Sequence, residues 1–474
     1  MKANLWLLGF LLLLSGGTAA KDAPSRDVAQ VVVRLDQPRQ VIEGFGASGC
    51  WWAQEVGNWP EATRREVGAR LFDREHGIGL TIYRHNLGAG SQDDAAITRP
   101  LRRAESLVGA DGALDWSRDA AATRLLHEFV AIGAQRVILF AVSPPVGMTK
   151  NGRAYGARPI GGIKTTNLAP GREADFARYL GAATAHFVGE AGLPVTGLSP
   201  LNEPEWGWDE PKQEGCHYSP AETVRMLRAA DTELQARALP VRLEGPELGS
   251  WETAIPYLKA IAADPVLRAR LSDIGVHSYF SQAAHKAKLR AWLDAHWPGA
   301  RLHMTEWCEL KTGRDFGMDS GLVLARTVLE DLVIGRVCSW QYWLAATPHD
   351  YRDGLLQLEP ATKTVRATKR LSALGQVSRF FRPGSVVLEV HTPWAEPRAV
   401  GARLAGGEIA LVCANSGSTP QKIQVTFSDG RDWRLVTAFV TDPTLDLAAQ
   451  PVADEPAFFL LPAESVTTFV MAPR

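Results

Sequence analysis

The chain has 474 residues, a length that suits one large domain with a smaller one attached. Hydrophobic residues make up 46% of it, which is enough for a large core, and the formal net charge is −1. A chain this close to neutral gives no electrostatic reason to expect nucleic acid or an anionic membrane surface as a partner.

The first segment, residues 1–20, is predicted to be a signal peptide. A lysine at position 2 precedes the apolar run LWLLGFLLLL, and the small residues SGGTAA follow, with a cleavage zone near Ala19 or Ala20. The run is short for a membrane span, so a membrane anchor is the less favoured alternative. We therefore expect a secreted or periplasmic monomer that does not associate with a membrane.

Residues 42–380 show short apolar runs that alternate with amphipathic stretches such as READFARYLGAATAHFVGEAG. Eight strands that alternate with helices predict an α/β fold of the parallel (β/α)8 TIM barrel type. The spacers are long enough for the crossovers that parallel strands require. The eight runs lie at 42–49, 78–88, 135–145, 195–204, 241–247, 273–280, 301–307 and 336–345.

The pattern changes near residue 384. Residues 385–474 contain short alternating runs separated by turn residues, which predicts a small antiparallel β-sandwich domain. Within residues 21–41, the run AQVVVRLDQ (29–37) precedes the barrel, and we expect it to pair with this sandwich. The five cysteines are widely spaced and contain no C-x-x-C pair, so one disulfide could form but no metal site is indicated.

The predicted barrel strands carry polar residues at their carboxyl ends, where TIM barrels place their active groups. Glu203 ends the fourth run and Glu306 ends the seventh. Two carboxyl groups that flank one glycosidic bond are the minimum equipment for its hydrolysis. The alternative is that both acids are structural ion-pair partners. The other candidates at strand ends are Arg84, Asn202, His277, Tyr279 and Trp343.

Indole side chains are unusually common, with 15 Trp against 8 Tyr. Trp206 and Trp208 follow Glu203 at once, and Trp52 follows the first run. Because an indole face can stack on the apolar face of a sugar ring, we expect these three to contact a saccharide. Packing within loops is the alternative for each of them.

The neighbours of the two acids suggest different ionisation states. Arg84 and the Tyr279 hydroxyl would lower the pKa of Glu306 and keep it charged. Poorer solvation and the charge of Glu306 would favour the protonated form of Glu203. Asn202 would donate to the 2-hydroxyl of a bound sugar, a contact that can strengthen in the transition state.

The motifs at the strand ends resemble those of a known enzyme class. NEP on the fourth strand, H-S-Y on the sixth and T-E-W on the seventh resemble a retaining glycoside hydrolase of clan A. GFGASGCWW, SPP, ALGQVSRFFRPG and PAESVTTFV narrow the resemblance to glycoside hydrolase family 30. The run QEGCHY (213–218) is similar to the endo-β-1,6-galactanase branch of that family.

The resemblance implies that Glu203 is the general acid/base and Glu306 the nucleophile of a double displacement. It also implies that Trp343 forms the floor under the bound ring, that His277 lines the site, and that neither a cofactor nor a metal is needed. The implied substrate is a β-linked polysaccharide or oligosaccharide, with β-1,6-galactan preferred over the alternatives of glucuronoxylan or exo-β-glycosidase action. Gly147 departs from the family, in which a Trp commonly follows SPP.

Two other functions are less consistent with the sequence. A carbohydrate-binding protein without catalysis has no need of an acid, a nucleophile and their hydrogen-bond donors together. GFGASG (44–49) matches the G-x-G-x-x-G pattern of dinucleotide sites, but such a site needs a helix to begin at once. Because CWWAQEVGNWP is a poor first helical turn, we assign GFGASG to the first barrel strand and its loop.

Overall fold

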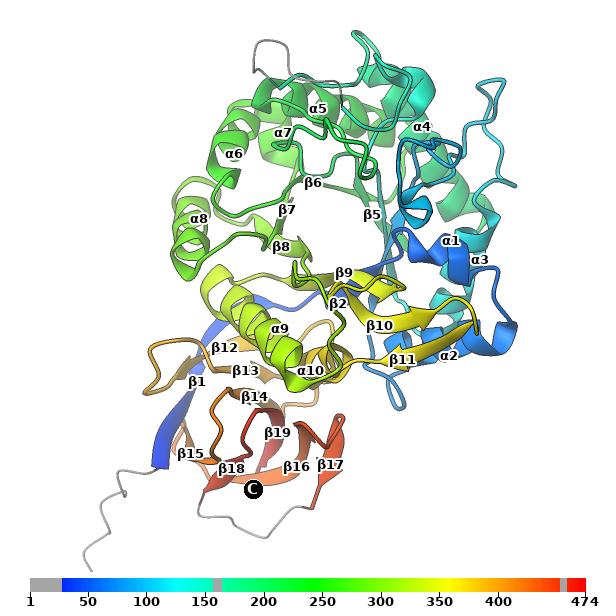
Figure 1. The fold of residues 1–474 in the computed structure, drawn as a ribbon. Helices are drawn as coiled ribbons and strands as arrows, with labels where there is room; N and C mark the ends of the chain where they lie inside the picture. Colours follow the sequence, from blue (N-terminus) through cyan, green and yellow to red (C-terminus); the bar gives the residue numbers. More distant parts are fainter. Residues whose placement is uncertain (1–27, 157–163, 452–457) are drawn as a thin grey trace, which may run out of the picture.

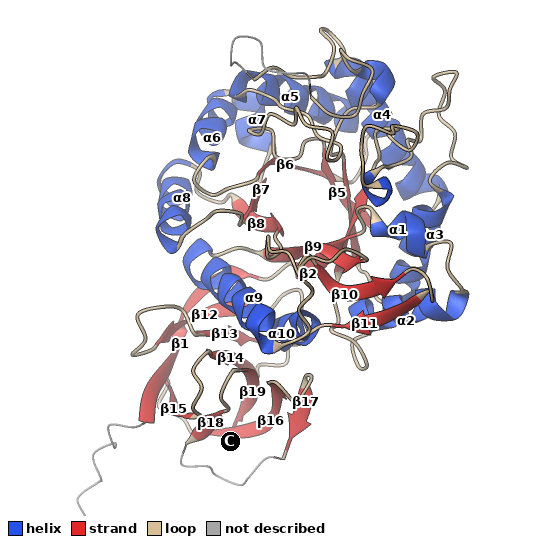
Figure 2. Ribbon diagram, viewed as in Figure 1, coloured by secondary structure: helices blue, strands red, loops and turns tan. Residues whose placement is uncertain are grey.

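The computed structural model describes residues 28–156, 164–451 and 458–474; the predicted signal peptide lies outside them. The described strands form a ten-stranded and a nine-stranded sheet. Figures 1 and 2 show a ring of helices around the first sheet, with the second sheet beside it. Among these residues, no helix combines the length and apolar character that a bilayer span requires.

Eight parallel strands close into a barrel. Each pairs with the next, and the last pairs with both its predecessor and the first. The predicted (β/α)8 barrel is thus confirmed, and each predicted run overlaps one strand. The strands are β2 (Gly44–Ser48), β3 (Ile82–Asn86), β4 (Arg136–Phe140), β5 (Val195–Ser199), β6 (Arg242–Leu248), β7 (Asp273–His277), β8 (Arg301–Glu306) and β9 (Ser339–Thr347).

The helices cover the outer face of the barrel (Figure 2). Because both faces of the strands are then buried, the strands read as nearly continuous apolar runs. The helices are α1 (Trp52–Val56), α2 (Glu61–Phe72), α3 (Ala120–Ile132), α4 (Glu173–Ala185), α5 (Pro220–Ala236), α6 (Ala254–Ala263), α7 (Pro265–Arg270), α8 (Ala283–His296), α9 (Met318–Glu330) and α10 (Lys369–Ser378). Single π-helical segments, His186–Glu190 and Asp331–Gly335, extend α4 and α9.

The glycines of GFGASG are explained by close packing. A Cβ on Gly46 would lie 2.6 Å from the carbonyl oxygen of Ile82, and a Cβ on Gly49 would lie 1.9 Å from the Tyr83 hydroxyl. Both glycines therefore allow β2 and the loop after it to approach β3. The expectation that no helix follows is wrong in one respect, since the single-turn helix α1 begins at Trp52.

A hairpin of β10 (Gly354–Glu359) and β11 (Thr364–Ala367) adds to β9 outside the barrel and was not predicted. The second sheet has the strand order β17-β16-β19-β14-β13-β12-β1-β15-β18. Its strands are β1 (Val28–Val41), β12 (Val386–His391), β13 (Ala399–Arg403), β14 (Ile409–Asn415), β15 (Gln421–Phe427), β16 (Trp433–Thr441), β17 (Ala448–Gln450), β18 (Phe459–Leu461) and β19 (Ser465–Pro473).

The second sheet curls around a core of its own that includes Val31, Leu411 and Phe469. β1 lies inside this sheet, antiparallel to β12 and parallel to β15, although it precedes the barrel in sequence. The sheet joins the barrel through α10, whose ten residues are all buried. In this contact the Gln376 amide donates to the Thr441 hydroxyl (2.8 Å), so the two domains share polar as well as apolar contacts.

All five cysteines are described, and each is buried and unpaired. No disulfide therefore accompanies the two cores, and their stability rests on packing and on buried polar contacts.

An ion-pair network lies at the amino-terminal end of the barrel strands, opposite the end that carries the predicted site residues. Glu43 accepts from Arg136 (2.9 Å) and Arg242 (2.7 Å), while Asp273 accepts from Arg301 (2.7 Å). Burial alone would raise the pKa of Asp273, but hydrogen bonds from His303 and Arg301 hold it well below its usual range. Glu43, Asp273 and His303 have spacing that could suit a cation, yet the arginines already balance their charge.

Asp273→Asn should destabilise the barrel, because Arg301 and His303 lose their buried charged acceptor and Glu43 alone is left to balance the arginines. We expect the free energy of unfolding to fall by about 3–5 kcal/mol, measured by urea denaturation. Asp294→Asn is the matched control, since Asp294 pairs with Arg290 on an exposed helix face, and there we expect about 1 kcal/mol or less. Equal losses for the two variants would contradict this account.

Candidate active site

A cavity of about 760 Å³ opens at the carboxyl ends of the barrel strands. Six of the ten predicted site residues line it: Glu203, Trp206, Trp208, Tyr279, Glu306 and Trp343. Arg84, Asn202 and His277 lie beneath them as buried side chains: Arg84 bonds to Glu306 and to Asn202, and His277 bonds to Glu203. The structure thus brings together nine residues that are up to 259 positions apart in the sequence.

Glu203 is held by a tight turn after β5. It has a positive φ of 45°, and its backbone N–H donates to the carbonyl of Glu247 (2.8 Å). Its own carbonyl accepts from the backbone N–H of Trp206 (3.1 Å) and from the indole N–H of Trp208 (3.0 Å). The turn therefore holds the Trp208 indole and the Trp206 backbone next to the acid.

Glu306 is the last residue of β8 and faces Glu203 across the cavity floor. One carboxylate oxygen of each, together with a ring nitrogen of His277, lie within 4.8 Å of one another. The side chains of Glu203 and Glu306 are only 9% and 5% exposed. Both carboxyl groups are therefore largely shielded from solvent but still line the cavity.

Arg84 is a buried cation that connects three of the polar residues of the site. One guanidinium nitrogen donates to Glu306 (2.9 Å), and the other donates to Glu247 (3.1 Å) and to the amide oxygen of Asn202 (3.2 Å). The guanidinium also lies 3.8 Å from the ring centre of Phe140. With its oxygen turned to Arg84, the Asn202 side chain keeps its NH2 group as a donor.

Glu247 is a third buried acid that the sequence analysis missed. It lies near the end of β6 and accepts from Arg84, from the Thr305 hydroxyl (2.6 Å) and from His277 Nε2 (3.1 Å). Burial would raise its pKa, but Arg84 and His277 outweigh burial and lower it to about 2. The rule that selected Glu203 and Glu306, an acid at a strand end, also applies to this residue.

His277 bridges two of the acids. Nδ1 lies 3.0 Å from Glu203 and Nε2 lies 3.1 Å from Glu247. Burial alone would lower the pKa of His277, but the charges of Glu306 and Glu203 and the bond to Glu247 raise it to about 10. At neutral pH the ring is therefore an imidazolium that donates from both nitrogens. The three acids then face two buried cations, Arg84 and His277. The cluster has little negative charge left to attract a metal ion.

The pKa of Glu306 differs from the expectation. Burial raises it, and the negative charge of Glu203 adds to this effect, while His277 and Arg84 oppose it. The net shift is upward, although Arg84 acts in the expected direction. Tyr279 donates to Glu306 (3.1 Å), and burial holds the pKa of this phenol well above its usual range, so it stays a donor.

The aromatic residues occupy different places. Trp343 packs edge-on against Trp51, with ring centres 5.4 Å apart, on the β9 and β2 side of the cavity. A Cβ on Gly249 would lie 2.4 Å from the Trp206 indole nitrogen and 3.0 Å from Glu203 Oε1, so this indole lies close to the acid. Trp206 therefore lies on the β5 side, across the barrel from Trp343.

Trp52 does not line the cavity. It is 2% exposed, lies 6.0 Å from Phe129 between ring centres, and donates its indole N–H to the carbonyl of Ser48 (2.8 Å). Its side chain points into the packing between α1 and α3 because α1 begins at this residue. We therefore leave Trp52 out of the proposed substrate contacts.

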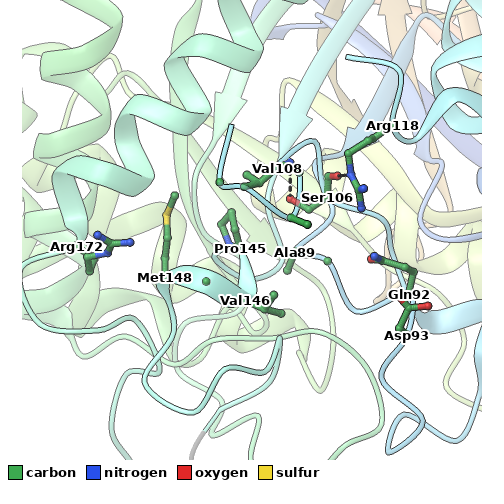
Figure 3. Close-up of a pocket in the computed structure, with 15 residues that line it drawn as sticks. Ala89, Gln92, Asp93, Ser106, Val108, Arg118, Pro145, Val146, Met148 and Arg172 are labelled. Carbon is green, nitrogen blue, oxygen red and sulfur yellow. Dashed lines mark hydrogen bonds between the residues drawn. The ribbon is translucent and has the colours of Figure 1, made fainter. Parts of the chain in front are cut away.

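A second cavity of about 510 Å³ lies between the loops that follow β3 and β4 (Figure 3). It shares no lining residue with the first cavity. Pro145, Val146 and Met148 line it, and so does Gly147, where the family commonly has a Trp. A Cβ on Gly147 would meet no atom within 4 Å, so this position has room for a side chain.

A closed parallel barrel with two acids facing one another at the carboxyl ends of its strands defines the glycosidase class of enzyme. The family model of O-glycosyl hydrolase family 30 matches residues 28–357. Since this match covers more than half of the chain, the protein belongs to that family, as its motifs suggested.

Solved structures share the whole architecture. A conserved exported protein from Bacteroides fragilis has a TM-score of 0.81 and 22% identity, covering 93% of this chain and 99% of that one. The catalytic domain of the family 30 xylanase C from Talaromyces cellulolyticus has a TM-score of 0.75 and 20% identity, covering 94% and 100%. An endo-β-1,6-glucanase has a TM-score of 0.69 and 17% identity, covering 93% of each chain. At these identities the likeness establishes the fold.

Glu247→Gln should lower the pKa of His277 below about 10, since one carboxylate that opposes desolvation is removed while the shape is kept. A ¹⁵N NMR titration of the imidazole measures this, with His277→Asn assigning the signal. Glu244→Gln is the control, because Glu244 is buried on the same strand but makes no bond to His277. A His277 pKa that stayed near 10 in Glu247→Gln would contradict the arrangement.

Proposed function

We propose that this glycosidase cleaves a β-linked glycan by double displacement with retention of configuration. The observation that carries the proposal is the separation of the two acids, whose nearest oxygens lie within 4.8 Å. Retaining enzymes have carboxyl groups about 5–5.5 Å apart, whereas inverting enzymes need about 6.5–9.5 Å to admit a water molecule. The short separation favours direct attack by one carboxylate.

In the first step Glu306 attacks the anomeric carbon while Glu203 gives its proton to the glycosidic oxygen, and the carbon–oxygen bond breaks. In the second step a water molecule gives a proton to Glu203 and attacks the same carbon, which releases Glu306. Arg84 and Tyr279 donate to Glu306, so they favour its charged form before the attack and after the release.

The proton balance of the site fits this order of events. Glu203 and Glu306 repel one another when both are ionised, and this repulsion contributes to the raised pKa of Glu306. One proton on the pair removes the repulsion. Glu306 accepts from two donors, Arg84 and Tyr279, whereas Glu203 accepts only from His277, so the hydrogen bonds favour Glu306 as the nucleophile and Glu203 as the general acid.

As substrate we propose a β-1,6-galactan, on the resemblance of QEGCHY (213–218) to the galactanase branch. Residues 213 and 214 of this run form hydrogen bonds that support the wall of the active-site cavity. Glu214 is fully buried and accepts from the backbone N–H of Ala89 (3.2 Å) and from the Ser91 hydroxyl (2.7 Å). Gln213 accepts from Arg102 (3.0 Å). The run thus ties the Glu203 loop to the long loop after β3, so its residues shape the cavity.

We also propose that the protein is exported. The predicted signal peptide supports this, and the similar Bacteroides fragilis protein is described as exported. The predicted monomeric state stays a prediction.

Glu306→Gln should lower turnover by about 10⁴-fold or more, because no other group can form the glycosyl–enzyme bond. Glu309→Gln is the matched control, since Glu309 lies three residues further on and bonds to Arg352 and Ser320 outside the cavity. Glu203→Gln should lose about 10²–10⁴-fold on glycans but keep more activity on aryl glycosides, whose leaving group needs no proton. Reducing-end release and ¹H NMR of the first anomer formed report the result; an α anomer from a β-linked glycan would overturn retention.

A glycan with acidic side groups, such as glucuronoxylan, is the second candidate. The sequence reveals no basic cluster, yet Arg99 and Arg102 line the cavity together with Lys212. Arg102 Nε is buried without a partner, and burial and the charge of Arg99 lower the Arg102 pKa. The positive charge of these three lining side chains favours a carboxylate ligand.

Arg102→Gln separates the two substrates. If the glycan is acidic, we expect kcat/KM on glucuronoxylan to fall about tenfold or more, since a charge-assisted hydrogen bond is lost. Activity on unsubstituted xylan and on β-1,6-galactan should then change little by comparison. Arg153→Gln, which removes an exposed charge paired with Asp94 outside the cavity, is the control. Equal losses on acidic and neutral glycans would exclude the acidic candidate.

A further inference from the structure

Phe280 lies in the turn after β7 and lines the active-site cavity. Its side chain is 70% exposed, more than any other large hydrophobic side chain in the described part of the chain. Leaving a phenyl ring in water forfeits the free energy of its burial. The fold therefore presents this ring to the cavity instead of packing it.

The backbone at Phe280 is also unfavourable. Its φ is +53°, a conformation that bulky residues rarely adopt. Of the ten described non-glycine residues with positive φ, four belong to this site: Glu203, Trp208, Glu247 and Phe280. Backbone strain of this kind is concentrated at functional sites, where contacts with the surrounding structure maintain it.

Phe280 forms an aromatic corner with Trp206. The ring centres lie 6.2 Å apart at an interplanar angle of 79°, and Trp206 lines the same cavity. Trp206 is fixed to the acid turn through its bond to the Glu203 carbonyl. The Trp206 indole and Glu203 Oε1 both lie beside Gly249, so the corner lies next to the acid.

The position of this corner fixes the part of the substrate that it can touch. Glu203 delivers its proton to the leaving oxygen, so the ring attached through that oxygen must lie on the Glu203 side. Around the barrel, β5 and β6 lie across from β9, which carries Trp343, and from β2, which Trp51 follows; β7 is the next strand after β6 (Figure 1). The sugar that reacts and the sugar that leaves therefore meet aromatic residues on opposite arcs.

We propose that Phe280 and Trp206 form the platform for the leaving-group sugar, and that Phe280 determines preference for chains over single glycosides. The ligand is a neutral pyranose ring with an apolar C–H face, which stacks on a phenyl or indole ring. This inference rests on the proposed retaining function and assigns the subsite beyond the cleaved bond.

The test compares two substrates that share a glycone. β-1,6-Galactotetraose places sugar rings on the leaving side, whereas the β-fluoride of β-1,6-galactobiose places none there. Should the glycan panel select another polysaccharide, its own tetramer and dimer fluoride take their place. The measured quantity is the ratio of kcat/KM for the tetramer to kcat/KM for the fluoride.

Phe280→Gly should lower this ratio about tenfold, because a stacked aromatic contact with the leaving sugar is lost. The same change relieves a positive φ, so the melting temperature should rise or stay level. Phe280→Tyr keeps an aromatic ring at this position, so this variant should keep the wild-type ratio. Lys363→Gly is the matched control: Lys363 has a φ of +55° in an exposed turn, so its replacement should relieve strain and leave the ratio unchanged.

An unchanged ratio in Phe280→Gly would overturn the platform. So would a lower melting temperature with equal losses on both substrates, since that result describes a structural role. If the wild-type enzyme cleaved neither substrate of any pair, the proposed function would fail and the platform with it. If it cleaved both while the ratio held in Phe280→Gly, only the platform would fail.

Discussion

The site depends on one buried charge, the guanidinium of Arg84. Transferring a cation into a barrel core costs free energy unless acids surround it, and here Glu247 and Glu306 do so. With the imidazolium of His277 the site holds two cations against three carboxylates. A single proton on the Glu203 and Glu306 pair then makes the group neutral, so the low dielectric favours the state from which the proposed reaction starts.

Much of the fold can be read from the sequence because a parallel barrel buries both faces of its strands. Each of the eight strands is therefore an apolar run between amphipathic helices, and its carboxyl end is visible as a change to polar residues. Two of the unpredicted elements lack this signal. β11 (Thr364–Ala367) alternates between exposed and half-buried residues, and β17 (Ala448–Gln450) is three residues long. In the sequence, neither segment can be distinguished from the loops around it.

The candidate site is predictable only where strand ends carry it. Arg84 and Glu306 were found because each lies in or at the end of an apolar run. Arg102 was not, since it comes from a long loop whose fold depends on Glu214, more than a hundred residues away. Trp52 and Trp206 illustrate the same limit. Both indoles follow a barrel strand, yet one is buried under a helix and the other faces the cavity.

The division between strand ends and loops also explains how one family can act on different glycans. The acids are fixed by a barrel whose core tolerates little change, whereas the cavity walls come from loops held by a few bonds. Glu214 makes several of these bonds. Burial raises the pKa of Glu214 to about 7, although the hydrogen bonds from Ser91 and Ala89 oppose this shift. Gly147, on the loop after β4, lines the second cavity and has room for a side chain, so this loop can change without disturbing Arg84 or the acids. Substrate preference can therefore change while the chemistry is kept.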